Sequence, residues 1–306
     1  MKDSTFFPQV ELLLRVLPLV AEEKMFALKG GTAINLFIRD MPRLSVDIDL
    51  TYLPLKGREE SIQEIGTAIK RIKQRIETTI EGAKVIPVNV SGTTAPTGLT
   101  VQFQGAQIKV EVNFVIRGSV FPVISSELCA TAQKKFGSFI TLNTLSKADL
   151  YGGKICAGLD RQHPRDFFDV KMLLESDGIV DDVKTAFVIY LASHSRPMNE
   201  LLNPTWKDIS KTFESDFEGM AVKPVTINEL LAARDSMLKA IRALMTDQDK
   251  QFLISVKSGE PIWSLINTSG IEKLPGLQWK VSNARKMTSE KRELALKKLK
   301  AALDLN

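Results

Sequence analysis

The chain has 306 residues, of which 44% are hydrophobic and 25% are charged, an ordinary globular composition that is long enough for two domains. Lys and Arg outnumber Asp and Glu by 41 to 36, and the net charge of +5 is compatible with a nucleic-acid partner without requiring one. Two cysteines make no disulfide framework, and two histidines are too few for a plausible zinc site. We therefore expect a protein of the reducing cytoplasm.

The first apolar run covers residues 10–17 and carries Glu11 and Arg15 inside it. Those charges predict an amphipathic helix rather than a signal peptide. No stretch of the sequence is long and apolar enough for a transmembrane helix, so we expect no membrane partner.

A pair of glycines follows the next apolar run. Residues 25–28 are predicted as a strand, after which Gly30, Gly31 and Thr32 open a helix that continues to residue 39. The N–H groups and positive dipole end at such a helix start favour a phosphate anion, and the missing side chains let it approach closely. On its own, a glycine pair usually marks only a turn.

Two alternate carboxylates follow in the segment SVDIDL at residues 45–50. In a strand, Asp47 and Asp49 project from one face, about 7 Å apart along the chain, and can share metal ions while the alternate apolar residues face the core. A lone pair of this kind is most often solvated. A glycine turn, one helix and then two such carboxylates indicate a nucleotidyltransferase that holds a metal-bound triphosphate.

A long helix and three strands are predicted next. The helix has isoleucines at spacings of three and four, which indicate one buried stripe: Ile62, Ile65, Ile69, Ile72, Ile76 and Ile80. Its basic residues, among them Arg71 and Arg75, fit a solvated surface better than an RNA contact. The strands are residues 84–90, 100–104 and 108–114, and the last two predict a hairpin.

Glu111 is a candidate third carboxylate. Apolar residues alternate with Lys109, Glu111 and Asn113, so Glu111 shares a face with the two aspartates if the strands share a sheet. A Glu beside two Asp needs a compensating cation, and Mg²⁺ suits carboxylates together with phosphate oxygens. Judged by itself, Glu111 fits the solvent face of an ordinary strand equally well.

Two further helices are predicted between residues 144 and 175, the second beginning at Pro164. Lys154 lies in an otherwise apolar turn, where a lysine usually extends to solvent but, if aimed at the sheet, would neutralise a triphosphate. Asp166 and Asp169 share a helix face. For Asp169, a favourable interaction with the first helical turn explains the residue as well as a functional role does.

These segments resemble the AbiEii/AbiGii toxin family of nucleotidyltransferases, the toxin halves of abortive-infection and type IV-like toxin–antitoxin pairs that act in phage defence. The resemblance rests on four segments in the family's order: residues 30–50, 109–113, 150–157 and 161–169. The family usually has Ser where this chain has Thr32, and often has Asp where this chain has Glu111.

The resemblance implies an α+β fold. Residues 1–176 would form a DNA polymerase β-like nucleotidyltransferase core, with a mixed sheet flanked by helices. Residues 177–306 would form a mainly helical domain, where helices are expected at 181–193, 208–219, 227–246 and 288–304. A capping box of Thr226 and Glu229 would start the third of these helices.

The resemblance also assigns roles to the residues that match the family's segments. Asp47 and Asp49 would bind Mg²⁺ or Mn²⁺, with Glu111 as a third ligand. The residues that hold the NTP would be Gly30, Gly31, Thr32, Ser45 and Lys154. Asp166 would either orient Lys154 or help to deprotonate the attacking hydroxyl.

Characterised relatives add nucleotides to the 3′ end of tRNA and block aminoacylation, so the resemblance implies a growth-arresting toxin with a cognate antitoxin. The same constellation would also serve a protein AMPylator or a nucleotidyltransferase that modifies an antibiotic, because the acceptor is chosen outside the metal site. A non-catalytic RNA- or protein-binding member of the fold and a toxin that transfers the γ-phosphate also stay open.

The C-terminal half offers few signals about the acceptor. Its last helix is basic, with Lys291, Arg292, Lys297, Lys298 and Lys300, which fits an RNA phosphate contact or, more often, a solubilising surface. Aromatic residues for base stacking are sparse, with Trp206, Trp263 and Trp279 the only tryptophans.

Overall fold

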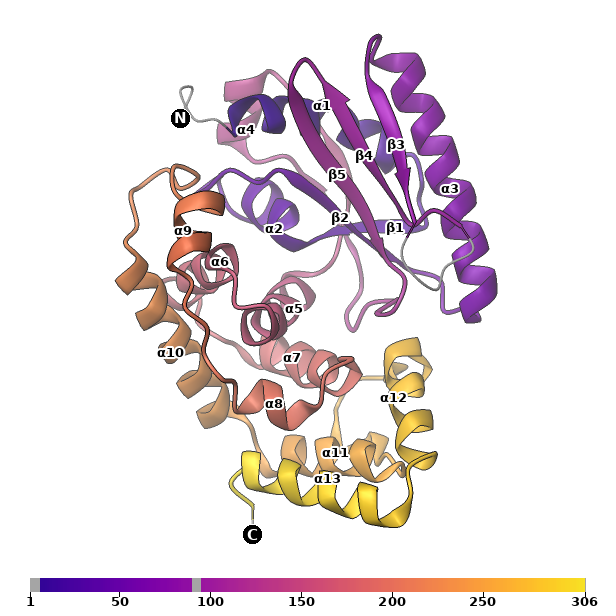
Figure 1. Ribbon diagram of the computed structural model, residues 1–306, viewed down its shortest axis with the longest axis vertical. Helices are drawn as coiled ribbons and strands as arrows, with labels where there is room; N and C mark the ends of the chain where they lie inside the picture. Colours follow the sequence, from indigo (N-terminus) through magenta and orange to yellow (C-terminus); the bar gives the residue numbers. More distant parts are fainter. Residues whose placement is uncertain (1–5, 90–94, 306) are drawn as a thin grey trace. The chain divides into compact units, whose positions relative to one another are not determined.

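The computed structural model describes residues 6–89 and 95–305 (Figure 1). The chain forms two compact units, and each is described by itself. The first unit comprises residues 1–146 and 217–224, and the second comprises residues 147–216 and 225–306. In Figure 1 most of the first unit runs from indigo to magenta, and the second extends to the yellow C-terminus.

The first unit is built on a seven-stranded mixed sheet with the order β3-β4-β5-β2-β1-β7-β6. Strand β2 lies at its centre, antiparallel to β1 and parallel to β5. The strands are β1 (Phe26–Lys29), β2 (Asp47–Tyr52), β3 (Lys84–Val88), β4 (Gly98–Phe103), β5 (Ala106–Asn113), β6 (Ile124–Glu127) and β7 (Thr141–Thr144). The predicted hairpin is β4–β5. Of the strand predicted at residues 84–90, Val90 lies outside the described residues.

Helices α1 (Phe7–Ala21) and α3 (Arg58–Thr79) contact each other and the sheet, while α4 (Ala130–Phe136) follows β6. The predicted isoleucine stripe of α3 is buried, as its spacing of three and four residues indicated. Two of its basic residues, Arg71 and Arg75, form ion pairs with the buried Glu23 after α1, at 2.6 and 2.8 Å. These two cations therefore help to fasten α3 to α1.

The second unit is helical. Its helices are α5 (Lys147–Asp160), α6 (Pro164–Leu174), α7 (Asp181–Ser193), α8 (Met198–Leu202), α9 (Ser210–Asp216), α10 (Ile227–Leu244), α11 (Asp247–Ser258), α12 (Pro275–Arg285) and α13 (Ser289–Ala302). A Cβ at Gly152 of α5 would lie 2.7 Å from the backbone nitrogen of Phe187 in α7, so this glycine permits the close approach of the two helices. The predicted capping box of Thr226 and Glu229 starts α10. In the part of the chain that the structure describes, no helix has the length and apolarity needed to cross a membrane.

The division between the units falls between Ser146 and Lys147, whereas the sequence predicted a boundary near residue 176. The reason is packing, because α5 lies against α7 and α6 lies against α10. Residues 217–224 return to the first unit, where the backbone N–H of Leu44 donates to Met220 O and that of Val222 donates to Pro42 O, each at 2.9 Å. The helix predicted at residues 208–219 is accordingly shorter, Ser210–Asp216.

Candidate active site

The glycine turn joins β1 to a short helix, α2 (Gly30–Ala33), which continues as a π-helical turn, Ile34–Ile38. Gly30 has φ +72°, and a Cβ there would lie 2.5 Å from Asp49 Oδ2. A Cβ at Gly31 would lie 2.5 Å from Arg43 Nη2. The positive φ favours glycine at position 30, and the turn packs directly against these charged side chains.

Two buried hydroxyls fasten the helix start to the strand that carries the aspartates. Thr32 Oγ1 lies 2.9 Å from Ser45 Oγ and 2.5 Å from the carbonyl oxygen of Asp47. Asn35 Nδ2 donates to Gly31 O at 2.8 Å, within the same helical segment. These contacts hold the glycine turn at a fixed distance from the first residue of β2.

Strand β2 begins at Asp47. Its two aspartates are half-buried, and they alternate with the buried Ile48 and Leu50. In the parallel pair of β2 and β5, Asp49 is in register with Glu111 and Asp47 with Lys109. Residues in register on neighbouring strands project from the same face of the sheet. The structure therefore brings Glu111 beside the aspartates, as the alternation predicted.

The electrostatics of Glu111 reflect these neighbours. Partial burial of its carboxyl raises the pKa of Glu111, although the side chain as a whole is exposed. The negative charges of Asp49 and Asp47 raise the pKa further. The nearby Lys109 and Lys29 oppose this shift without cancelling it. A cation between these carboxylates would relieve their repulsion.

Among the residues that the structure describes, no group of three or more His, Cys, Asp or Glu side chains is gathered closely enough to hold a metal ion. Glu111 is therefore beside the aspartates without completing a three-carboxylate cluster with them. Asp47 and Asp49 still fit Mg²⁺, which commonly takes one or two carboxylates and completes its shell with water and substrate phosphates. The excess of negative charge around Glu111 supports the same fit.

Two basic residues beside this site were not singled out from the sequence. Lys29 is in register with Asp49 across the antiparallel pair of β1 and β2. Arg43 is 1% exposed, and its Nη1 donates to Leu44 O at 2.8 Å. In the sequence, Lys29 comes directly before the glycine pair, and Arg43 comes two residues before Ser45. This closeness to predicted site residues was the only sequence signal for either one.

Lys154 and Asp166 lie in the second unit, where α5 and α6 form a buried ion cluster. Lys154 Nζ lies 3.1 Å from Asp166 Oδ1 and 3.0 Å from Asp169 Oδ2. Arg161 also binds Asp166 through two hydrogen bonds, at 2.6 and 2.7 Å. Lys154 is only 4% exposed, so it does not extend to solvent, and Asp169 belongs to the same cluster as Asp166.

The neighbouring cations favour the ionised form of Asp166. Complete burial acts to raise the pKa of Asp166, but the charges and hydrogen bonds of Lys154 and Arg161 outweigh burial and hold that pKa well below its usual range. A carboxylate of this kind is a weak base. The two predicted groups of site residues are thus divided between the units, with the glycine turn and the acids in the first and Lys154 with Asp166 in the second.

The fold has a counterpart among solved structures. MenT4, a nucleotidyltransferase toxin from Mycobacterium tuberculosis H37Rv, superposes with a TM-score of 0.61 over 95% of this chain and 92% of MenT4, at 15% sequence identity. At that identity the likeness concerns the fold, a mixed sheet flanked by helices, which confirms the predicted α+β class. The chain therefore shares the fold of this solved structure.

The family follows from the sequence comparison. The family model described as nucleotidyl transferase AbiEii toxin, type IV toxin–antitoxin system, matches residues 11–283. The chain belongs to this family, as the four sequence segments predicted, and membership implies a cognate antitoxin. No protein of curated function matches the chain.

Proposed function

We propose that this toxin transfers a nucleoside monophosphate from an NTP to the 3′-terminal hydroxyl of tRNA, in the cytoplasm, and so blocks translation. The observation that carries the proposal is the close packing of the Gly30–Gly31 turn against Asp49, with Asp47 on the same strand. This packing combines an anion-binding helix start with two carboxylates that suit a divalent cation.

In the proposed reaction, the oxygen of the acceptor hydroxyl bonds to the α-phosphorus of the NTP, the bond from that phosphorus to the bridging oxygen breaks, and pyrophosphate leaves. The hydroxyl loses its proton to solvent. Asp47 and Asp49 would hold Mg²⁺ or Mn²⁺, with Glu111 beside them. The bound ion would lower the pKa of the hydroxyl and stabilise the leaving pyrophosphate.

The remaining residues act by positioning and charge, which supply most of the catalysis in phosphoryl and nucleotidyl transfer. Gly30, Gly31 and Thr32 would present backbone N–H groups to the phosphates, while Ser45 fixes the turn through Thr32. The family resemblance assigns the phosphates to Lys154. The low pKa of Asp166 favours the orientation of Lys154 over proton abstraction as its role.

The test is incubation of the purified protein with Mg²⁺, total tRNA and each α-³²P-labelled NTP in turn, beside an Asp49→Asn variant. Label on tRNA with the wild type alone would support the proposal and identify the nucleotide. Label on protein would indicate AMPylation, and label on neither would favour a small-molecule acceptor or a binding role. A γ-³²P-labelled NTP that labels the acceptor would instead identify phosphate transfer.

A further inference from the structure

A groove in the second unit has the chemistry of a nucleotide-binding surface. One wall is the face of α12 that carries Gln278, Val281 and Ser282, and the other is formed by Pro261 and Trp263. Its volume is about 380 Å³, within the range of small-molecule sites. Arg285 and Lys286 lie at the end of α12, and the described residues that line this groove include no Asp or Glu.

Trp263 is partly buried and contacts one aromatic ring of the core. Its ring packs on Phe252 of the buried face of α11, with ring centroids 6.1 Å apart. Trp263 also lines a second hollow of about 770 Å³, which adjoins the groove. An aromatic ring anchored from the core and bordered by two hollows is a suitable platform for stacked bases.

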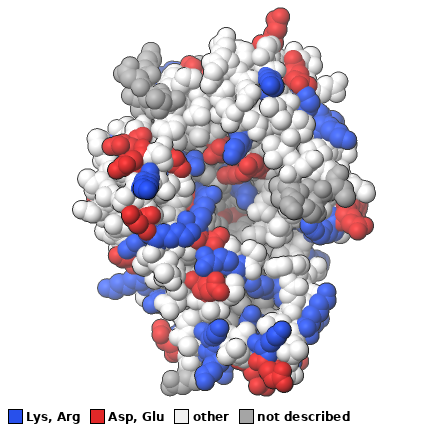
Figure 2. All heavy atoms as spheres, in the orientation of Figure 1, with Lys and Arg blue, Asp and Glu red and all other residues white. Residues whose placement is uncertain are grey.

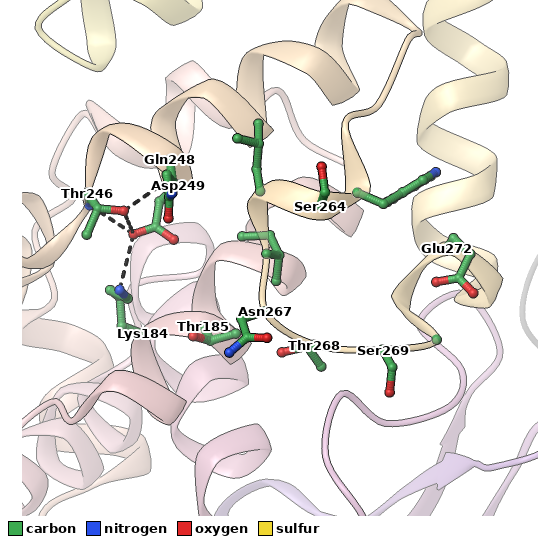
Figure 3. A pocket seen from close by; sticks show the side chains of 14 residues that line it. Lys184, Thr185, Thr246, Gln248, Asp249, Ser264, Asn267, Thr268, Ser269 and Glu272 are labelled. Carbon is green, nitrogen blue, oxygen red and sulfur yellow. Dashed lines mark hydrogen bonds and ion pairs between the residues drawn. The ribbon is translucent and has the colours of Figure 1, made fainter.

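The second hollow is lined by polar and apolar side chains and carries two acids, Asp249 and Glu272, and one base, Lys184 (Figure 3). Asp249, which lines it, is occupied by the helix cap of Thr246 and by an ion pair with Lys184 at 3.3 Å. Figure 3 also shows Asn267 and Thr268 on the loop that borders it. Amide and hydroxyl groups of this kind can bond to sugar hydroxyls and base edges.

We propose that the groove between α12 and Trp263 binds unpaired nucleotides of the acceptor RNA, with a base stacked on Trp263 and phosphates paired with Arg285 and Lys286. This inference rests on the proposed function, because RNA is the acceptor proposed there. The two adjacent cations of the groove and its aromatic wall favour a single strand of RNA over a protein segment, which needs no phosphate partners.

The basic helix α13 is the competing surface. Its two acids, Glu290 and Glu293, lie at its N-terminal end, its C-terminal half carries three lysines, and it lacks an aromatic residue. On the face drawn in Figure 2, basic and acidic side chains are mixed over the C-terminal helices rather than gathered by sign. Lys297 and Lys298 of α13 are exposed, and they provide a charge-matched control for Arg285 and Lys286.

The test is the affinity of the full chain for a fluorescein-labelled single-stranded oligoribonucleotide, measured by anisotropy at several salt concentrations without NTP. We expect Arg285→Gln with Lys286→Gln to weaken binding roughly tenfold, and to lower the salt slope by about 1.4, or about 0.7 per phosphate contact. Trp263→Leu should weaken binding on the order of tenfold, and Trp263→Phe should restore part of it. Lys297→Gln with Lys298→Gln should leave binding within about twofold of the wild type if the α12 groove is the main contact.

Arg285 Nε donates to Gly259 O at 2.8 Å, so its loss could loosen the loop. Lys286→Gln alone avoids that bond and should lower the salt slope by about 0.7. Unchanged RNA affinity in these variants, or a loss confined to the α13 control, would overturn the inference. A loss of antitoxin binding with RNA affinity intact would overturn it in favour of a protein partner.

Transfer is measured separately on the same samples. If the wild type binds RNA through the groove but transfers no nucleotide, the groove stands and the proposed function fails. If the wild type labels tRNA and the groove variants retain its KM for tRNA, the function stands and the groove is wrong. A wild type that binds no RNA would contradict both.

Discussion

Asp49 and Glu111 occupy the same register on the parallel strands β2 and β5, and the charge of Asp49 raises the pKa of Glu111. Asp49 also lies against the glycine turn, since a Cβ at Gly30 would approach its Oδ2 to 2.5 Å. Asp49 thus lies between the glycine turn and Glu111. Substitutions at these positions separate their roles.

Asp49→Asn keeps the shape of the side chain and removes its charge. We expect nucleotide transfer to fall by about 10³-fold or more, because an amide is a poor ligand for Mg²⁺. The pKa of Glu111 should fall in the same variant, since a neighbouring negative charge is lost. Transfer assays and an NMR titration of Glu111 measure the two effects, and Glu81→Gln, an exposed carboxylate in the same unit, should change neither.

Glu111→Gln should stabilise the metal-free protein at neutral pH. The pKa of Glu111 is raised in the folded state, so ionisation costs stability as the pH rises above the unfolded value, about 4.3. Below that pH, Glu111 is protonated in both states, and the wild type and the variant should unfold at similar temperatures.

Mg²⁺ should reverse the difference in stability between the wild type and Glu111→Gln if the ion lies close to Glu111. The unfolding temperature of the wild type would then rise more with Mg²⁺ than that of Glu111→Gln. An equal rise in both proteins would remove Glu111 from the metal site. Glu127→Gln on β6 serves as the control, because Glu127 is an exposed carboxylate on another strand of the same sheet.

Gly30→Ala and Gly105→Ala form a matched pair. Both glycines have positive φ, +72° and +81°, so each substitution should cost about 1–2 kcal/mol of stability from backbone strain. Only Gly30 has a neighbour, Asp49, in the path of a Cβ; Gly105 has nothing within 4 Å. We expect Gly30→Ala to cost more and to lower transfer, and equal effects of the two variants on stability and transfer would argue against the turn as part of the site.

The local features of this site could be predicted from sequence because each depends on residues that are close together in the chain. Strand alternation placed Asp47 and Asp49 on one face, and the glycine pair marked the turn beside them. The burial of Arg43 could not be predicted in this way. It lies in a segment that pairs with residues 220–222, far along the chain, and sequence periodicity carries no information about that pairing.

Long-range packing also explains the different unit boundary. Helices α5 and α6 carry segments of the family resemblance and follow the sheet directly in sequence, which favoured their assignment to the core. Within the second unit, α5 packs against α7 and α6 packs against α10. Nothing in the spacing of α5 or α6 distinguishes a sheet from another helix as the partner of an apolar face.

Lys154→Met should destabilise the second unit. The variant leaves Asp166 and Asp169 buried with one cation fewer, and removal of one partner from a buried ion cluster costs about 3–5 kcal/mol. Chemical denaturation measures the loss. Lys171→Met on α6 is the control, because its pairs with the exposed Glu175 and Glu229 should each contribute less than about 1 kcal/mol.

The pH dependence of stability distinguishes the ion cluster of Lys154 and Asp166 from Glu111 in the first unit. The pKa of Asp166 is lowered in the folded state, so its stabilising contribution is complete above the unfolded value of about 3.9 and is lost as the pH falls further. Asp166→Asn should therefore lose stability at neutral pH and show a weaker dependence on pH below about 4. If Asp166→Asn were as stable as the wild type at pH 7, the ion cluster would not hold α5 against α6, and the expected effect of Lys154→Met on stability would fail with it.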